Sequence, residues 1–254
     1  MKTLLLVLLC SIPSWAGKRI VMNMTVDGVS QRLETLVEPT RLRMNMGDLA
    51  SIIFLTDGGR SRIVTLTPAT NQYMEIDQAI FIELQTSLDG LFAKLPPEMR
   101  DQLKEQMRKE TTSVAQPQVP KMVLSGERTV KGFPCKVYAV MNGDLKTQEV
   151  CVASAADLGI SSADAAVFGL MRTFSEELLR SLSQLPFPMQ LDGFEQYLNP
   201  LSGTRDGQGV QVIHYENGKA TAEDLIQSVD DATFTDADFS TGTAVKREMP
   251  RFPQ

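Results

Sequence analysis

The stretch Pro134–Ala153 reads PCKVYAVMNGDLKTQEVCVA, and it decides the fold. Runs rich in Val and Tyr flank Asn-Gly, a dipeptide typical of the tight turn of a β-hairpin. If the loop is the three residues 142–144, Cys135 faces Cys151. Directly opposed residues have Cβ atoms about 4.5–5.5 Å apart, which local adjustment can bring to the usual disulfide separation of about 3.5–4.5 Å. The sequence therefore predicts a hairpin closed by a Cys135–Cys151 disulfide.

Two alternatives stay open for this hairpin. A two-residue loop of Asn142 and Gly143 would shift the pairing by one residue and place Cys135 opposite Val150. The cysteines could also be two buried thiols of a reduced protein. Disulfides persist in oxidising compartments such as the bacterial periplasm, so a bonded pair predicts an exported protein.

The start of the chain predicts the same location. A lysine precedes an apolar run, and Ser14 and Ala16 are small residues at positions −3 and −1 of a cut before Gly17. We therefore expect residues 1–16 to be a signal peptide and residues 17–254 to form one periplasmic domain. The apolar run is shorter than the roughly 20 residues of a membrane-spanning helix. No later segment approaches that length, so we expect no membrane span.

Cys10 offers an alternative end to this leader, as the lipid-bearing residue of a lipoprotein. Leu9 argues against it, because lipoprotein processing needs a small residue there. Removing residues 1–16 also takes Cys10 away. The two cysteines that remain are an even count, which suits one disulfide.

The charge of the chain excludes one class of partner. It has 25 basic and 31 acidic residues, a formal net charge of −6 at pH 7. A nucleic-acid binder needs a basic surface, so we expect no nucleic acid as a partner. The composition is otherwise ordinary for a globular protein.

Alternating apolar residues and short turns predict an antiparallel meander near the N-terminus. Met22 and Met24 fall on one face of the first strand, and Met44 and Met46 on one face of the third. The strands expected in this meander span residues 19–26, 29–37, 41–46, 51–56, 60–66 and 72–76.

Helical spacing follows the meander. Apolar residues recur at helical intervals over 78–109, where Pro96-Pro97 must interrupt. A second helical stretch covers 161–184, and Ser161 and Asp164 have the spacing of a capping box at its start. Besides the cysteine hairpin, the remaining strands are expected at residues 121–130, 210–216, 219–229 and 245–249.

These elements predict an α+β fold on one antiparallel sheet of about nine to eleven strands, with helices on one face. A sheet of this size should curl, because strand twist accumulates. We therefore expect a half-barrel whose concave side is covered by the helices.

The run Ser125–Tyr138, SGERTVKGFPCKVY, resembles a stretch of a secreted bacterial family of unknown function. Glu149–Ala153 and Tyr215–Lys219 resemble later segments of that family, and the likeness runs loosely over most of residues 17–254. The family is similar to the LolA/LolB group, whose half-barrel with a helical lid shelters lipoprotein acyl chains in the bacterial envelope. The resemblance implies a LolA/LolB-like fold and a periplasmic location. It carries no activity and no site residue to this chain.

The sequence shows no catalytic motif. His214 is the single histidine, and a metal site needs several convergent ligands. Serine-hydrolase chemistry would need an elbow of the form Gly-x-Ser-x-Gly, which is absent. The glycines between 203 and 209 lack the Gly-Lys-Ser/Thr of a phosphate-binding loop. We therefore expect no enzyme, no bound metal and no cofactor.

Methionine is the one residue type whose placement indicates a function. It is flexible and polarizable, and it serves surfaces that accept variable apolar partners, although it also fills gaps in ordinary cores. We expect a lipid or acyl chain on the concave face, lined by Met22, Met24, Met44, Met46, Ile52 and Phe54. The alternative is a structural or protein-interaction component of the envelope whose half-barrel is filled by its own side chains.

Overall fold

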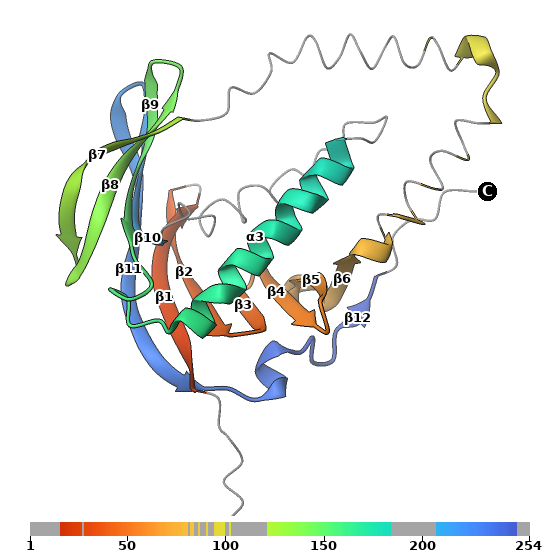
Figure 1. Ribbon diagram of the computed structural model, residues 1–254, viewed down its shortest axis with the longest axis horizontal. Helices are drawn as coiled ribbons and strands as arrows, with labels where there is room; N and C mark the ends of the chain where they lie inside the picture. Colours follow the sequence, from red (N-terminus) through yellow and green to blue (C-terminus); the bar gives the residue numbers. More distant parts are fainter. Residues whose placement is uncertain are drawn as a thin grey trace, which may run out of the picture.

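The computed structural model describes residues 16–26, 28–80, 121–183 and 207–247, with scattered residues between 82 and 102. In that part of the chain, twelve strands form one sheet in the linear order β12-β6-β5-β4-β3-β2-β1-β11-β10-β9-β8-β7. All neighbours run antiparallel except the parallel pair β12 and β6. Figure 1 shows this sheet curving around one long helix, α3 (Ser162–Ser183). The predicted curved sheet with helical cover on its concave side is confirmed.

The elements lie close to the predicted ranges. The N-terminal meander comprises β1 (Ala16–Val26), β2 (Val29–Glu38), β3 (Arg41–Met46), β4 (Ala50–Asp57), β5 (Arg60–Thr67) and β6 (Gln72–Asp77). The later strands are β7 (Lys121–Val130), β8 (Phe133–Asn142), β9 (Leu145–Ala153), β10 (Gln208–Glu216), β11 (Lys219–Thr233) and β12 (Val245–Lys246). Two 3₁₀ turns, η1 (Pro68–Thr70) and η2 (Asp236–Phe239), complete the described elements.

Tight turns join the strands at positions that need a left-handed backbone. Asn217 and Gly218 have φ of 52° and 77°, and Gly58 and Gly59 have φ of 55° and 80°. Two consecutive positive φ values are the signature of the type I′ turn, whose twist matches that of the strands it joins. Asn-Gly and Gly-Gly adopt it with little strain, so these dipeptides fix the hairpins β10–β11 and β4–β5.

The register of the cysteine hairpin differs from the prediction. Asn142 pairs with Leu145, so the loop is a two-residue turn rather than residues 142–144. A bulge beside Met141 then shifts the pairing, and Cys151 lies opposite Val137 rather than opposite Cys135. The three-residue loop and the direct opposition of the cysteines were wrong, because alternation alone does not reveal a bulge.

The two cysteines still meet, as diagonal neighbours on one face of the hairpin. Their Cα atoms lie 5.5 Å apart and their Sγ atoms are bonded at 2.02 Å. That Cα separation lies within the range of about 4.4–6.8 Å that is usual for a disulfide. Both cysteines are buried, which places the bond inside the main apolar cluster.

The convex side of the sheet is covered in part by the C-terminal segment. Phe234 and Phe239 pack on Leu36, Ile53 and Val64, which point outward from β2, β4 and β5. The two phenylalanine rings meet edge to face at 5.7 Å. This contact carries the chain from the end of β11 across the convex face to β12.

The first predicted helical stretch lies largely outside the described residues. At its start, the backbone N–H of Ile80 donates to the Asp77 carboxylate at 2.9 Å, as in an N-cap. Ile82 and Met99, two of the described residues in the stretch, are exposed. Whether this stretch helps to cover the concave face therefore stays a prediction.

Candidate functional site

The predicted lining residues lie together on the concave face. Five of the six are buried, with exposed fractions between 0 and 8%, and Met24 is half-buried at the edge of the group. Cross-strand pairing explains the grouping: Met44 lies opposite Ile52 in β4, and Phe54 lies opposite Leu42 in β3. Since directly opposed residues share a face, alternation placed these side chains correctly.

Helix α3 closes this face with its own apolar stripe. Val167, Met171 and Phe174 belong to the same cluster as the sheet residues, and the ring of Phe174 lies 6.1 Å from that of Phe54. Ser161 caps the helix, because its Oγ accepts the backbone N–H of Asp164 and donates to the Asp164 carboxylate. The interface between helix and sheet therefore carries methionine on both sides.

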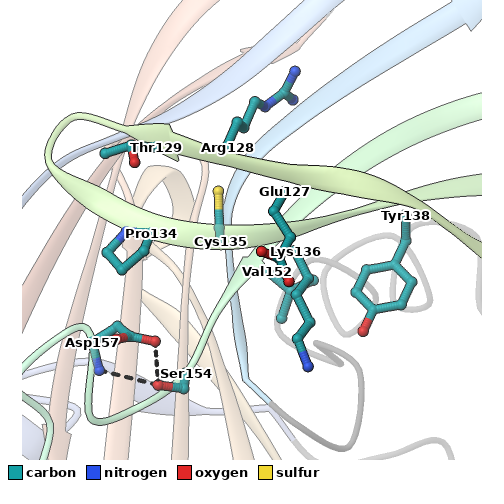
Figure 2. Close-up of a pocket in the computed structure, with 10 residues that line it drawn as sticks. All are labelled: Glu127, Arg128, Thr129, Pro134, Cys135, Lys136, Tyr138, Val152, Ser154 and Asp157. Carbon is teal, nitrogen blue, oxygen red and sulfur yellow. Dashed lines mark hydrogen bonds between the residues drawn. The ribbon is translucent and has the colours of Figure 1, made fainter.

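A second feature is a depression of about 410 Å³ beside the cysteine hairpin. Figure 2 shows Glu127, Pro134, Lys136 and Tyr138 on one side of the hairpin and Cys135 on the other. The floor near the end of β9 is fixed by a small turn, in which Ser154 Oγ donates to Asp157 Oδ2 at 2.5 Å. The lining residues are Glu127, Arg128, Thr129, Pro134, Cys135, Lys136, Tyr138, Val152, Ser154 and Asp157.

Sequence reasoning missed this depression. Ser154 and Asp157 have the same Ser-x-x-Asp spacing as the helix cap at Ser161, and the backbone N–H of Asp157 donates to Ser154 Oγ at 3.1 Å. That spacing was the available signal for an ordered turn after β9. The rest of the lining follows from the hairpin register, which the sequence did not reveal.

A charged cluster lies beside the same hairpin, formed by side chains of β7 and β9. Glu149 accepts from Arg128 Nη1 at 3.0 Å and from Lys146 Nζ at 2.6 Å. The Lys146 ammonium also lies 4.2 Å from the centre of the Tyr215 ring. The hydrogen bond from Lys146 lowers the pKa of Glu149, although partial burial opposes this effect, and the same bond raises the pKa of Lys146. One carboxylate therefore faces two cations.

Both ring nitrogens of His214 lie close to polar side chains of neighbouring strands. Its Nε2 lies 2.9 Å from Asp224 Oδ2, and its Nδ1 lies 3.5 Å from Gln148 Nε2. Asp224 is buried and also accepts the backbone N–H of Thr25. Through these contacts, the side chain of His214 links its own strand, β10, to β9 and β11.

The described residues hold neither a metal cluster nor a membrane-spanning helix. No three of their His, Cys, Asp or Glu side chains are grouped to hold a metal ion. Of the helices that the structure describes, none has the length and apolar character needed to cross a membrane.

Comparison with known proteins finds no matching family model and no matching curated protein. Several solved structures align over most of the chain. An uncharacterized conserved protein from Thermus thermophilus is 9% identical, covers 92% of this chain and 91% of its own, and has a TM-score of 0.41. A DUF1329 family protein from Desulfovibrio piger is 10% identical over 90% of this chain and 91% of its own, with a TM-score of 0.28.

A chain of the Pseudomonas aeruginosa MucA/MucB complex is 11% identical over 90% of this chain, with a TM-score of 0.38. The match spans only 56% of that chain's length. At similarities this low, we transfer no activity, ligand or partner from these proteins. The resemblance to the LolA/LolB group stays a prediction.

Proposed function

We propose that this protein is a non-catalytic binding module of the cell envelope that holds an apolar or acyl-bearing ligand between its curved sheet and α3. The observation that carries the proposal is the methionine content of that interface. Met22, Met44 and Met46 from the sheet and Met171 from the helix belong to one apolar cluster. Methionine has three rotatable side-chain bonds, so such an interface can repack around an inserted chain.

The architecture supports a helix that moves while the sheet keeps its shape. The strands are joined by backbone hydrogen bonds, whereas α3 is held to them by side-chain packing such as Phe174 on Phe54. Lifting the helix would break no strand pairing. Its cost is the exposure of apolar surface, at about 25 cal/mol per Å², and an acyl chain would cover that surface again.

A fluorescent fatty-acid analogue tests the proposal. We expect saturable, one-to-one binding to the purified protein, and a loss of that binding in Met46→Glu, at the edge of the cluster. Leu49→Glu, three residues away and 47% exposed, is the matched control and should bind normally. Circular dichroism must show that both variants are folded. Equal binding by the two variants would place the ligand elsewhere.

One observation favours the alternative, a structural or interaction role with a filled core. Leu42 and Phe54 have no exposed surface at all, as expected for a core packed by its own side chains. Native mass spectrometry of protein purified from its own periplasm separates the two roles. Copurified lipid supports the binding module. A protein that carries no lipid and binds no probe leaves the structural role.

A further inference from the structure

Arg128 has a guanidinium edge without an acceptor. Its Nη1 donates to Glu149 Oε1 at 3.0 Å. Its Nε and Nη2 are both buried from solvent, and neither has a hydrogen-bond partner. Nε and Nη2 together form the side-on fork of a guanidinium, the edge that grips a carboxylate or phosphate with two parallel bonds. The whole of that fork is therefore unused.

Leaving these two buried nitrogens without an acceptor destabilises the folded protein. A buried donor on a charged group loses its hydrogen bonds to water and gains none in return. Glu149 does not relieve this loss, because its oxygens accept from Arg128 Nη1 and from Lys146, and neither accepts from Nε or Nη2. With two cations against one carboxylate, the cluster keeps a positive charge that favours a further anion.

The position of Arg128 connects this fork to the apolar interior. Arg128 lies opposite Cys135 in the β7–β8 pairing, and Glu149 precedes Cys151 by two residues on β9. Both cysteines belong to the main apolar cluster. Figure 2 shows Arg128 and Cys135 on the opposite side of the hairpin from Lys136 and Tyr138. Two residues along a strand span about 6.6 Å, so the charged cluster borders the interior on the same face.

We propose that Arg128 binds the anionic head group, a carboxylate or a phosphate, of a ligand whose apolar chain lies in the interior. This inference rests on the proposed function and names its ligand class, an anionic amphiphile. The head group completes the Arg128 fork, and the neighbouring Lys146 adds a second positive charge.

The chain offers a matched control for this site. Arg62 Nη1 donates to Glu75 Oε1 at 3.0 Å, and Lys246 Nζ approaches the other oxygen of Glu75 at 2.8 Å. This cluster repeats the Arg-Glu-Lys arrangement of Arg128, Glu149 and Lys146. Of the arginine nitrogens that the structure describes, only those of Arg128 are buried without a partner, so Arg62 has the ion pair without the orphaned fork.

The test uses the full mature chain and the variants Arg128→Gln, Arg128→Lys and Arg62→Gln. Hexadecanoate, hexadecyl phosphate and hexadecanol share one chain length and compete for the fluorescent fatty-acid analogue. We expect Arg128→Gln to bind the two anions roughly tenfold more weakly or worse, as for the loss of a charge-assisted pair. Hexadecanol should bind Arg128→Gln and wild type equally, and Arg62→Gln should match wild type with every probe.

The remaining outcomes separate the claims. Arg128→Lys keeps the charge but loses the fork, so we expect intermediate affinity, and full affinity would overturn the bidentate contact. A larger loss for hexadecanoate identifies a carboxylate ligand, and a larger loss for hexadecyl phosphate a phosphate. Equal anion binding by wild type and Arg128→Gln, with hexadecanol still bound, overturns the head-group site and leaves the proposed function standing. If no probe binds wild type, both claims fail.

Discussion

Gly17 lies at a position that has no room for a side chain. A Cβ atom there would lie 2.4 Å from the carbonyl oxygen of Val37 and 2.8 Å from the ring of Phe234. The first contact is backbone in the middle of the sheet, which cannot give way cheaply. The close approach of β1 to β2 and to the convex phenylalanine therefore depends on glycine.

We expect Gly17→Ala to lower the free energy of unfolding by about 1–3 kcal/mol, the usual cost of overpacking. Gly169→Ala is the control, because Gly169 lies within α3 and a Cβ there meets nothing within 4 Å. Alanine should stabilise that helix position by roughly 0.5–1 kcal/mol. Urea unfolding curves of the two variants check the opposite signs, and a loss in both would contradict the argument.

At the scale of the element, the cysteine hairpin carries a removable crosslink. The cysteines are 16 residues apart in sequence, and the chain-entropy model gives about 3 kcal/mol for a loop of this length. Replacing both by serine should lower the melting temperature while the fold survives, because the β8–β9 pairing remains. Thiol counting on denatured, non-reduced mature protein should find none, and two free thiols would refute the bond in the native host.

The positions of the strands and of helix α3, and the faces that they bury, were the features best predicted from the sequence. Alternation placed Met22, Met44 and Met46 on one buried face, and the Ser161 cap began the helix where expected. The hairpin register was not predictable, because the bulge beside Met141 leaves no mark in the pattern of apolar residues. The cluster of Arg128, Glu149 and Lys146 was not predicted either, because it depends on the pairing register of β7, β8 and β9.

At the scale of the whole molecule, two similar charged clusters lie toward opposite ends of the sheet. Glu75 belongs to β6, next to edge strand β12, and Glu149 belongs to β9, near edge strand β7. Hydrogen bonds from Lys246 and Lys146, respectively, hold the pKa of each carboxylate below its ordinary value of 4.5. A lowered folded-state pKa contributes stability above the unfolded pKa, and that stability is lost as the pH falls.

We therefore expect the urea midpoint to fall as the pH drops below about 4.5 and through the lowered pKa values. In the double variant Glu75→Gln, Glu149→Gln, the midpoint at neutral pH should be lower and its fall in acid shallower. The comparison needs both proteins over the same pH series at one ionic strength. Parallel curves for the two proteins would show that other groups control the acid response.

The place of β1 in the sheet bears on the export that the sequence predicts. One neighbour, β2, follows it directly in the chain, but the other is β11, and the pairing reaches from Ala16 to Thr233. A chain that crosses a membrane from its N-terminus delivers β1 first and its second partner nearly last. One edge of β1 therefore has no hydrogen-bonded neighbour until almost the whole chain has crossed the membrane. The predicted cut before Gly17 falls at the start of this strand, so we expect a signal peptidase to reach that bond before β11 pairs with β1.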